Sequence, residues 1–139
     1  MADDATEIVR SWYTATAGRI DAEALDFWYQ TVWHPDVDWR AVAGAPDDSG
    51  VMYGRDRLRA YMQELQEAFD DIVVEPLEVT EVGEYVVADV RFRGRSRGAG
   101  VPVELRFSVT FRLRGGKVVS GREYLTHGEA IAAASLQPS

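Results

Sequence analysis

The chain contains no cysteine and only two histidines, so several kinds of chemistry are excluded or scarce. Without cysteine there is no disulfide, thiol nucleophile or thiolate metal ligand. His34 and His127 do not stand in a metal-ligand spacing, and we expect no metal site. The phosphate-binding loop, the dinucleotide fingerprint, the serine-hydrolase elbow and the zinc-protease helix motif are also missing. We therefore expect no cofactor.

Long hydrophobic runs are missing as well. No run approaches the roughly 18 apolar residues that a membrane-spanning helix needs. The first residues, Met-Ala-Asp-Asp, are acidic and lack the basic and apolar regions of a signal peptide. We expect a cytoplasmic protein with no membrane partner.

Basic residues are fewer than acidic ones, 15 against 23, and the net charge is −8. An overall acidic field opposes binding to nucleic acid. The charge is uneven: residues 1–90 hold 20 acidic and 6 basic side chains, and residues 91–139 hold 3 and 9. The segment 91–100 is similar to an Arg-Gly nucleic-acid segment, but Arg91 and Arg93 alternate as strand residues do, which favours arginines solvating a sheet edge. We expect no nucleic-acid partner.

The chain of 139 residues is long enough for one domain with its own core, over residues 1–139. Apolar residues at helical spacing predict helices over 4–17, 21–33 and 55–69. Turn-forming residues predict a loop over 44–54. Strands are predicted over 37–42, 72–82, 84–93, 101–114 and 117–125, and a short helix over 126–135.

Strand 101–114 carries the strongest pattern, because apolar and polar residues alternate along its whole length. Such alternation is typical of an antiparallel sheet covered on one side. Helices come early and strands late, which predicts an α+β fold with three N-terminal helices packed on a curved antiparallel sheet. The space between the two layers is either a packed core or a pocket.

Four tryptophans fall in the first 40 residues, at 12, 28, 33 and 39. They fill the core or line a pocket for a flat apolar ligand, and both interpretations stay open. Glu123 lies in the last predicted strand beside Gly121. In an apolar cavity its pKa would rise and it could act as a general acid or base. The alternatives are an ion pair with an arginine or a side chain facing solvent.

Four segments together resemble the SnoaL-like and ketosteroid-isomerase-like branch of the nuclear-transport-factor-like superfamily. They are residues 16–21 (TAGRID), 34–40 (HPDVDWR), 53–55 (YGR) and 116–124 (GKVVSGREY). The resemblance covers about residues 5–134. It implies a cystatin-like α+β cone with a central apolar pocket, often dimeric through the outer face of the sheet.

The resemblance also indicates which family residues are missing. Ketosteroid isomerases use a tyrosine, a carboxylate base and a protonated acid, and these positions fall near Ser11, Trp39 and Val109. The acid/base of SnoaL-type cyclases falls at Thr126. Steroid isomerisation by that mechanism is therefore not expected. Glu123 remains the ionisable wall residue, with His127 near the pocket mouth.

We expect an apolar small molecule as ligand, with Glu123 and His127 as catalytic residues of a cofactor-free isomerase, cyclase or dehydratase. The alternative is a binding or dimeric interaction module without chemistry. A homodimer would form through the polar outer face, which includes Asp89, Arg91, Glu104, Arg106, Ser108, Thr110 and Arg112. The expected pocket residues are Trp12, Trp28, Trp39, Tyr61, Leu65, Val90, Leu105, Phe107, Val109, Phe111 and Gly121.

Overall fold

The computed structural model describes residues 4–42 and 50–136, and the structural statements below refer to these residues. The helical segments are α1 (Ala5–Thr16), α2 (Ala22–Phe27), the π-helical turn η1 (Trp28–Val32), α3 (Arg55–Ala68) and α4 (His127–Leu136). The strands are β1 (Trp33–Arg40), β2 (Met52–Tyr53), β3 (Phe69–Val82), β4 (Tyr85–Ser96), β5 (Pro102–Arg114) and β6 (Lys117–Tyr124).

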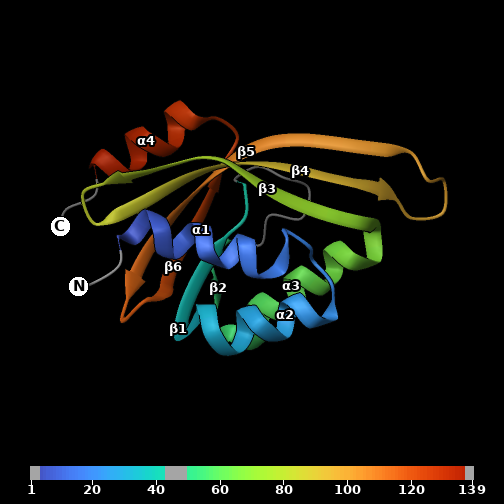
Figure 1. Cartoon of the computed structure of the whole chain (residues 1–139), viewed down its shortest axis with the longest axis horizontal. Coiled ribbons are helices and arrows are strands. Elements are labelled where there is room, and N and C mark those ends of the chain that lie inside the picture. Colours follow the sequence, from blue (N-terminus) through green and yellow to red (C-terminus); the bar gives the residue numbers. More distant parts are fainter. Residues whose placement is uncertain (1–3, 43–49, 137–139) are drawn as a thin grey trace.

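The strands form one curved sheet in the order β2-β1-β6-β5-β4-β3, with α1, α2 and α3 on its inner side (Figure 1). This is the expected α+β cone. The pairing differs from expectation in one respect, because β1 runs parallel to β6 and the sheet is mixed. Strands β3 to β6 follow one another as antiparallel neighbours, and β1 adds to the free edge of β6. A connection through α3 to the opposite edge permits this direction.

Asp4 caps the start of α1 by accepting a hydrogen bond from the Thr6 backbone N–H at 2.9 Å.

The junction at the end of α1 explains why the chain turns where it does. Gly18 follows the helix with φ +73°, and a Cβ there would lie 2.5 Å from the Val74 carbonyl oxygen. The Val74 N–H donates to the Gly18 carbonyl at 2.7 Å. Glycine is therefore needed where the end of α1 meets β3.

The second predicted helix, over 21–33, is confirmed as α2 followed directly by the π-helical turn η1. Asp21 caps it, as predicted, by accepting from the Ala24 N–H at 2.8 Å. Helical structure ends at Val32, and β1 begins at Trp33 instead of residue 37. The residue before Pro35 favours extended backbone, which suits a strand that already includes His34. In the predicted loop over 44–54, residues 44–49 lie outside the described residues, and Met52–Tyr53 forms β2.

The final helix, α4, packs on the outer side of the sheet, opposite the other helices (Figure 1). Ala130 and Ala134 are buried against Val87 of β4. This helix and the adjoining strands leave Asp89, Ser108 and Thr110 buried, so three residues of the expected dimer face are not available for a partner. No helix among the described residues is long and apolar enough to cross a membrane.

Candidate functional site

A cavity of about 240 Å³ lies between the inner helices and the concave face of the sheet. Its wall comes from both layers, because one face of each inner helix and alternate residues of β3 to β5 point into the same space. Nine of the residues expected from the sequence lie in this wall. They are Trp28, Trp39, Tyr61, Leu65, Val90, Leu105, Phe107, Val109 and Glu123.

Three expected pocket residues lie behind the wall. The Trp12 and Phe111 rings pack edge to face, with centroids 5.9 Å apart. Phe111 also contacts the Trp39 ring at a centroid distance of 5.9 Å. Gly121 is covered by the same Trp39 ring. These residues support the cavity wall and do not line the cavity.

The Glu123 carboxylate is held by donors from two other elements. Its Oε2 accepts a hydrogen bond from Trp39 Nε1 at 2.7 Å and one from the Tyr61 hydroxyl at 3.5 Å. Trp39 and Gly121 are register partners in the parallel β1–β6 pair. A Cβ on Gly121 would come within 2.1 Å of the Trp39 ring. The missing side chain therefore lets the indole lie over β6 and reach Glu123.

Tyr13 of α1 is a wall residue that sequence reasoning missed. Burial raises the pKa of its hydroxyl, and the negative charge of Glu123 raises that pKa further. Tyr13 thus keeps its proton and can act as a hydrogen-bond donor. The buried face of α1 is Val9, Trp12, Tyr13 and Thr16, at the 3–4 spacing of an amphipathic helix. This spacing is the signal in the sequence that could have indicated Tyr13.

Charge is sparse along the cavity wall. Arg19 and Glu123 are the charged side chains among the described lining residues, and Arg19 Nε pairs with Asp21 at 2.9 Å. Trp33 also lines the cavity, and its buried Nε1 has no hydrogen-bond partner among the described residues. The wall therefore combines a large apolar surface with one carboxylate, one guanidinium, a threonine, two tyrosines and the unpartnered indole N–H of Trp33.

The structure corrects the expectation for His127, which does not lie at the mouth of this cavity. His127 is the first residue of α4, and its Nδ1 lies 2.9 Å from Asp89 Oδ1 on the outer side of the sheet. The reason is that the chain turns after β6 at Thr126, which caps α4 by accepting from the Glu129 N–H at 3.1 Å. The turn carries His127 away from Glu123.

The arginines of segment 91–100 serve the sheet, as the alternation of Arg91 and Arg93 favoured. Arg91 pairs with Glu104 at 3.1 Å, and Arg97 with Asp70 at 3.1 Å. Asp38 of β1 pairs with Arg122 at 2.7 Å. These ion pairs hold Arg91, Arg97 and Arg122 at the sheet, and none of the three arginines lines the cavity.

Comparisons with known proteins agree with the fold. A family model described as a SnoaL-like domain matches residues 9–121. The chain is similar to the solved structure of an NTF2-like protein from Burkholderia thailandensis E264, with 24% identity and a TM-score of 0.71, over 99% of this chain and 100% of that chain. No curated protein matches the chain by sequence.

Two further solved structures were determined with small molecules. One is a protein with a ketosteroid isomerase-like fold from Catenulispora acidiphila DSM 44928, in complex with trimethylamine; identity is 20% and the TM-score 0.68, over 95% of this chain and 94% of that chain. The other is TerC co-crystallised with polyporic acid, with 20% identity and a TM-score of 0.70, over 93% of this chain and 99% of that chain. At these identities the likeness establishes the fold.

Proposed function

The chain belongs to the SnoaL-like domain family, and from this premise we propose that its cavity binds an apolar, carbonyl-bearing small molecule and that Glu123 transfers a proton on it. The observation that carries the proposal is a carboxylate in the wall of an otherwise apolar cavity, with its Oε2 held by Trp39 at 2.7 Å. A carboxylate fixed in this way can take a proton from carbon and return it. Isomerisation, cyclisation and dehydration all use such a step.

The proton balance of this step needs no other reagent. Glu123 removes a proton from a carbon next to the ligand's carbonyl group, and the electron pair of the C–H bond moves to the carbonyl oxygen. The resulting enolate takes the proton back from Glu123 at the same or another carbon. Because negative charge develops on the oxygen, hydrogen-bond donors in the wall lower the barrier.

Donors for that oxygen are available among the other lining residues of the cavity. Tyr13 keeps its proton because burial raises its pKa. The Trp33 N–H is buried without a partner among the described residues, and a buried donor of this kind gains from an acceptor. Crystallisation of TerC with polyporic acid supports the expectation that a fold of this type accepts a small molecule.

The first test measures carbon-acid exchange. We expect the protein to accelerate deuterium incorporation next to the carbonyl of 2-tetralone, an apolar bicyclic ketone, in heavy water, followed by proton NMR. Glu123→Gln removes the base and should abolish the acceleration, since general-base catalysis contributes about 100- to 10,000-fold. Leu65→Met keeps an apolar side chain in the wall and serves as the matched control, which should retain most of the activity.

A binding measurement distinguishes the two proposed functions. Trp28, Trp33 and Trp39 line the cavity, so anilinonaphthalene sulfonate bound there will quench tryptophan fluorescence. Quenching that is retained in Glu123→Gln together with lost exchange supports catalysis by Glu123. Quenching without exchange in the unmodified protein supports the alternative, a binding module without chemistry. Exchange that survives in Glu123→Gln contradicts the role of Glu123.

A further inference from the structure

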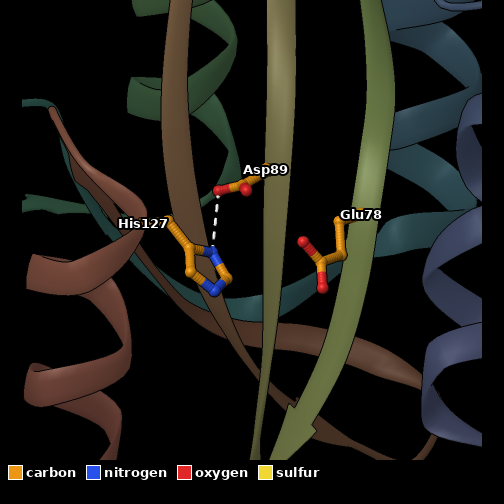
Figure 2. Close-up of side chains that lie close together, drawn as sticks. All are labelled: Glu78, Asp89 and His127. Carbon is orange, nitrogen blue, oxygen red and sulfur yellow. Dashed lines mark hydrogen bonds and ion pairs between the residues drawn. The ribbon is translucent and has the colours of Figure 1, made fainter.

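A second group of reactive side chains lies on the outer face of the sheet, away from the cavity. Glu78 of β3, Asp89 of β4 and His127 of α4 each offer one potential metal-ligand atom, and these atoms lie within 4.8 Å of one another. Figure 2 shows that the three side chains turn toward a common space beside the start of α4. The expected catalytic role of His127 does not explain this arrangement.

Asp89 is fixed in place for such a role. It is 9% exposed, and its Oδ1 accepts a hydrogen bond from the Ser108 hydroxyl of β5. The same oxygen lies 2.9 Å from His127 Nδ1. Two ligand atoms that bind one tetrahedral zinc ion at about 2.0–2.1 Å are about 3.3 Å apart, so a bound ion would replace this hydrogen bond and the two groups would separate slightly.

The charges around these residues are unbalanced. Glu78 and Asp89 are register partners on neighbouring strands, and like charges placed opposite each other are destabilising. Two other acids of this face are compensated, because Arg91 lies 3.7 Å from Glu75 and 3.1 Å from Glu104. Among the described residues, no lysine or arginine forms an ion pair with Glu78 or Asp89. Their basic partner among the described residues is His127, whose Nδ1 lies 2.9 Å from Asp89 Oδ1 and which carries a charge only when protonated, so the pair has no permanent cation beside it.

We propose that Glu78, Asp89 and His127 bind a divalent transition-metal ion, with water in the remaining coordination positions. An imidazole with two carboxylates suits Zn²⁺ better than Mg²⁺ or Ca²⁺, which prefer oxygen ligands alone. The ion would join β3 and β4 to the first residue of α4. Sequence spacing could not indicate this site, because its ligands come from three separate elements that only the sheet brings together.

Calorimetric titration of the full chain with zinc chloride, after treatment with EDTA and buffer exchange, tests the proposal. We expect one Zn²⁺ per chain. Removing a group that only hydrogen-bonds a metal ligand weakens metal binding by about 10- to 100-fold. Removing a ligand itself, as in His127→Gln or Glu78→Gln, should therefore weaken Zn²⁺ binding at least 10-fold. Glu78 is exposed, so Glu78→Gln should fold normally and its binding loss cannot come from unfolding.

The chain provides matched controls for both variants. His34→Gln removes the other histidine, which lies 4.0 Å from Asp36, and Glu75→Gln removes an acid of the same strand and face that is paired with Arg91. Both controls should bind Zn²⁺ with unchanged affinity. Absence of stoichiometric binding to the unmodified chain overturns the proposal. So does an equal loss in His34→Gln, which would indicate adsorption of zinc to exposed histidine. Neither result affects the role proposed for Glu123.

Discussion

Gly121 decides where the Trp39 ring can lie, and through it where the Glu123 carboxylate is held. Its inner side is filled by carbon atoms of the indole, which would stand 2.1 to 2.9 Å from an added Cβ. A rigid, buried ring cannot yield as the end of a flexible side chain does. Glycine at position 121 therefore lets the Trp39 ring lie close against β6, where its N–H reaches Glu123.

Gly121→Ala should destabilise the protein by about 1–3 kcal/mol, because it overpacks the wall. It should also disrupt the Trp39–Glu123 hydrogen bond and change tryptophan fluorescence. Urea unfolding followed by fluorescence measures both effects. Ser120→Ala, which changes the neighbouring residue, should stay within about 0.5 kcal/mol of the unmodified protein. Equal stability of the two variants would show that the wall tolerates a methyl group.

Tyr13 makes the stability of the folded protein depend on pH in the alkaline range. Its pKa is raised in the folded protein, chiefly by burial and then by the charge of Glu123. The unfolded chain loses this proton near the ordinary tyrosine pKa of about 10, while the folded protein keeps it. The contribution to stability is therefore complete below pH of about 10 and is lost as pH rises toward the folded pKa.

Melting curves between about pH 9 and 11 test this sign. We expect the melting temperature of the unmodified protein to fall more steeply with pH than that of Tyr13→Phe, which has no proton to lose. The comparison of slopes removes the effect of the lost hydroxyl itself and of the other tyrosines. Parallel curves would contradict a raised pKa at Tyr13.

The helix α4 is attached to the outer side of the sheet through two buried alanines, Ala130 and Ala134. It is rich in alanine, and Ala130 is fully buried whereas Ala132 is exposed. Ala130→Leu should cost about 1–3 kcal/mol by overpacking the contact with Val87. Ala132→Leu adds the same atoms on the exposed side and should change the unfolding free energy by less than about 0.5 kcal/mol. Chemical unfolding of the two variants checks this, and equal losses would mean that α4 packs on another face.

The sequence predicted an element well where apolar and polar residues alternate or separate clearly, and poorly where they do not. β5 was clear because apolar residues alternate with polar or charged ones from Val103 to Leu113. The helix α4 was predicted, but its position on the outer side was not, because five of its ten residues are Ala or Gly and mark no apolar stripe. The start of β1 at Trp33 was missed because Trp28 to Val32 continue a helical pattern into the π-helical turn.

The site was predicted to the same uneven degree. The apolar wall residues of the strands follow from alternation, whereas the place of Glu123 in the wall came from the family resemblance, because both faces of its strand are about equally apolar. Tyr13 was not among the expected pocket residues, and the position of His127 depended on a turn of the chain that periodicity does not describe. The hydrogen bond from Trp39 to Glu123 joins residues 84 positions apart, so only the pairing of β1 with β6 could indicate it.

For the molecule as a whole, the outer face of the sheet beyond α4 is the surface expected to bind a second copy of the chain. The long β4–β5 arm extends past the helices (Figure 1), and its outer face carries Arg91 and Glu104 with Arg106. Mixed charges on a face of this kind can pair with a second copy around a two-fold axis. We expect light scattering to give a dimer, twice the chain mass of 15.5 kDa. A particle of 15.5 kDa at micromolar concentration would contradict this expectation.

The parallel pairing of β1 with β6 also has a consequence for the order of folding. β6 is the last strand to be synthesised, yet it lies inside the sheet between β1 and β5. Until β6 emerges, β1 has only β2 to pair with, and Trp39 has neither Gly121 beneath it nor Glu123 to bond. Contacts between distant segments form slowly because a long loop must close first. The Glu123 carboxylate and the indole that holds it therefore meet late, and Trp39 emission will report the closing steps of folding rather than the first collapse.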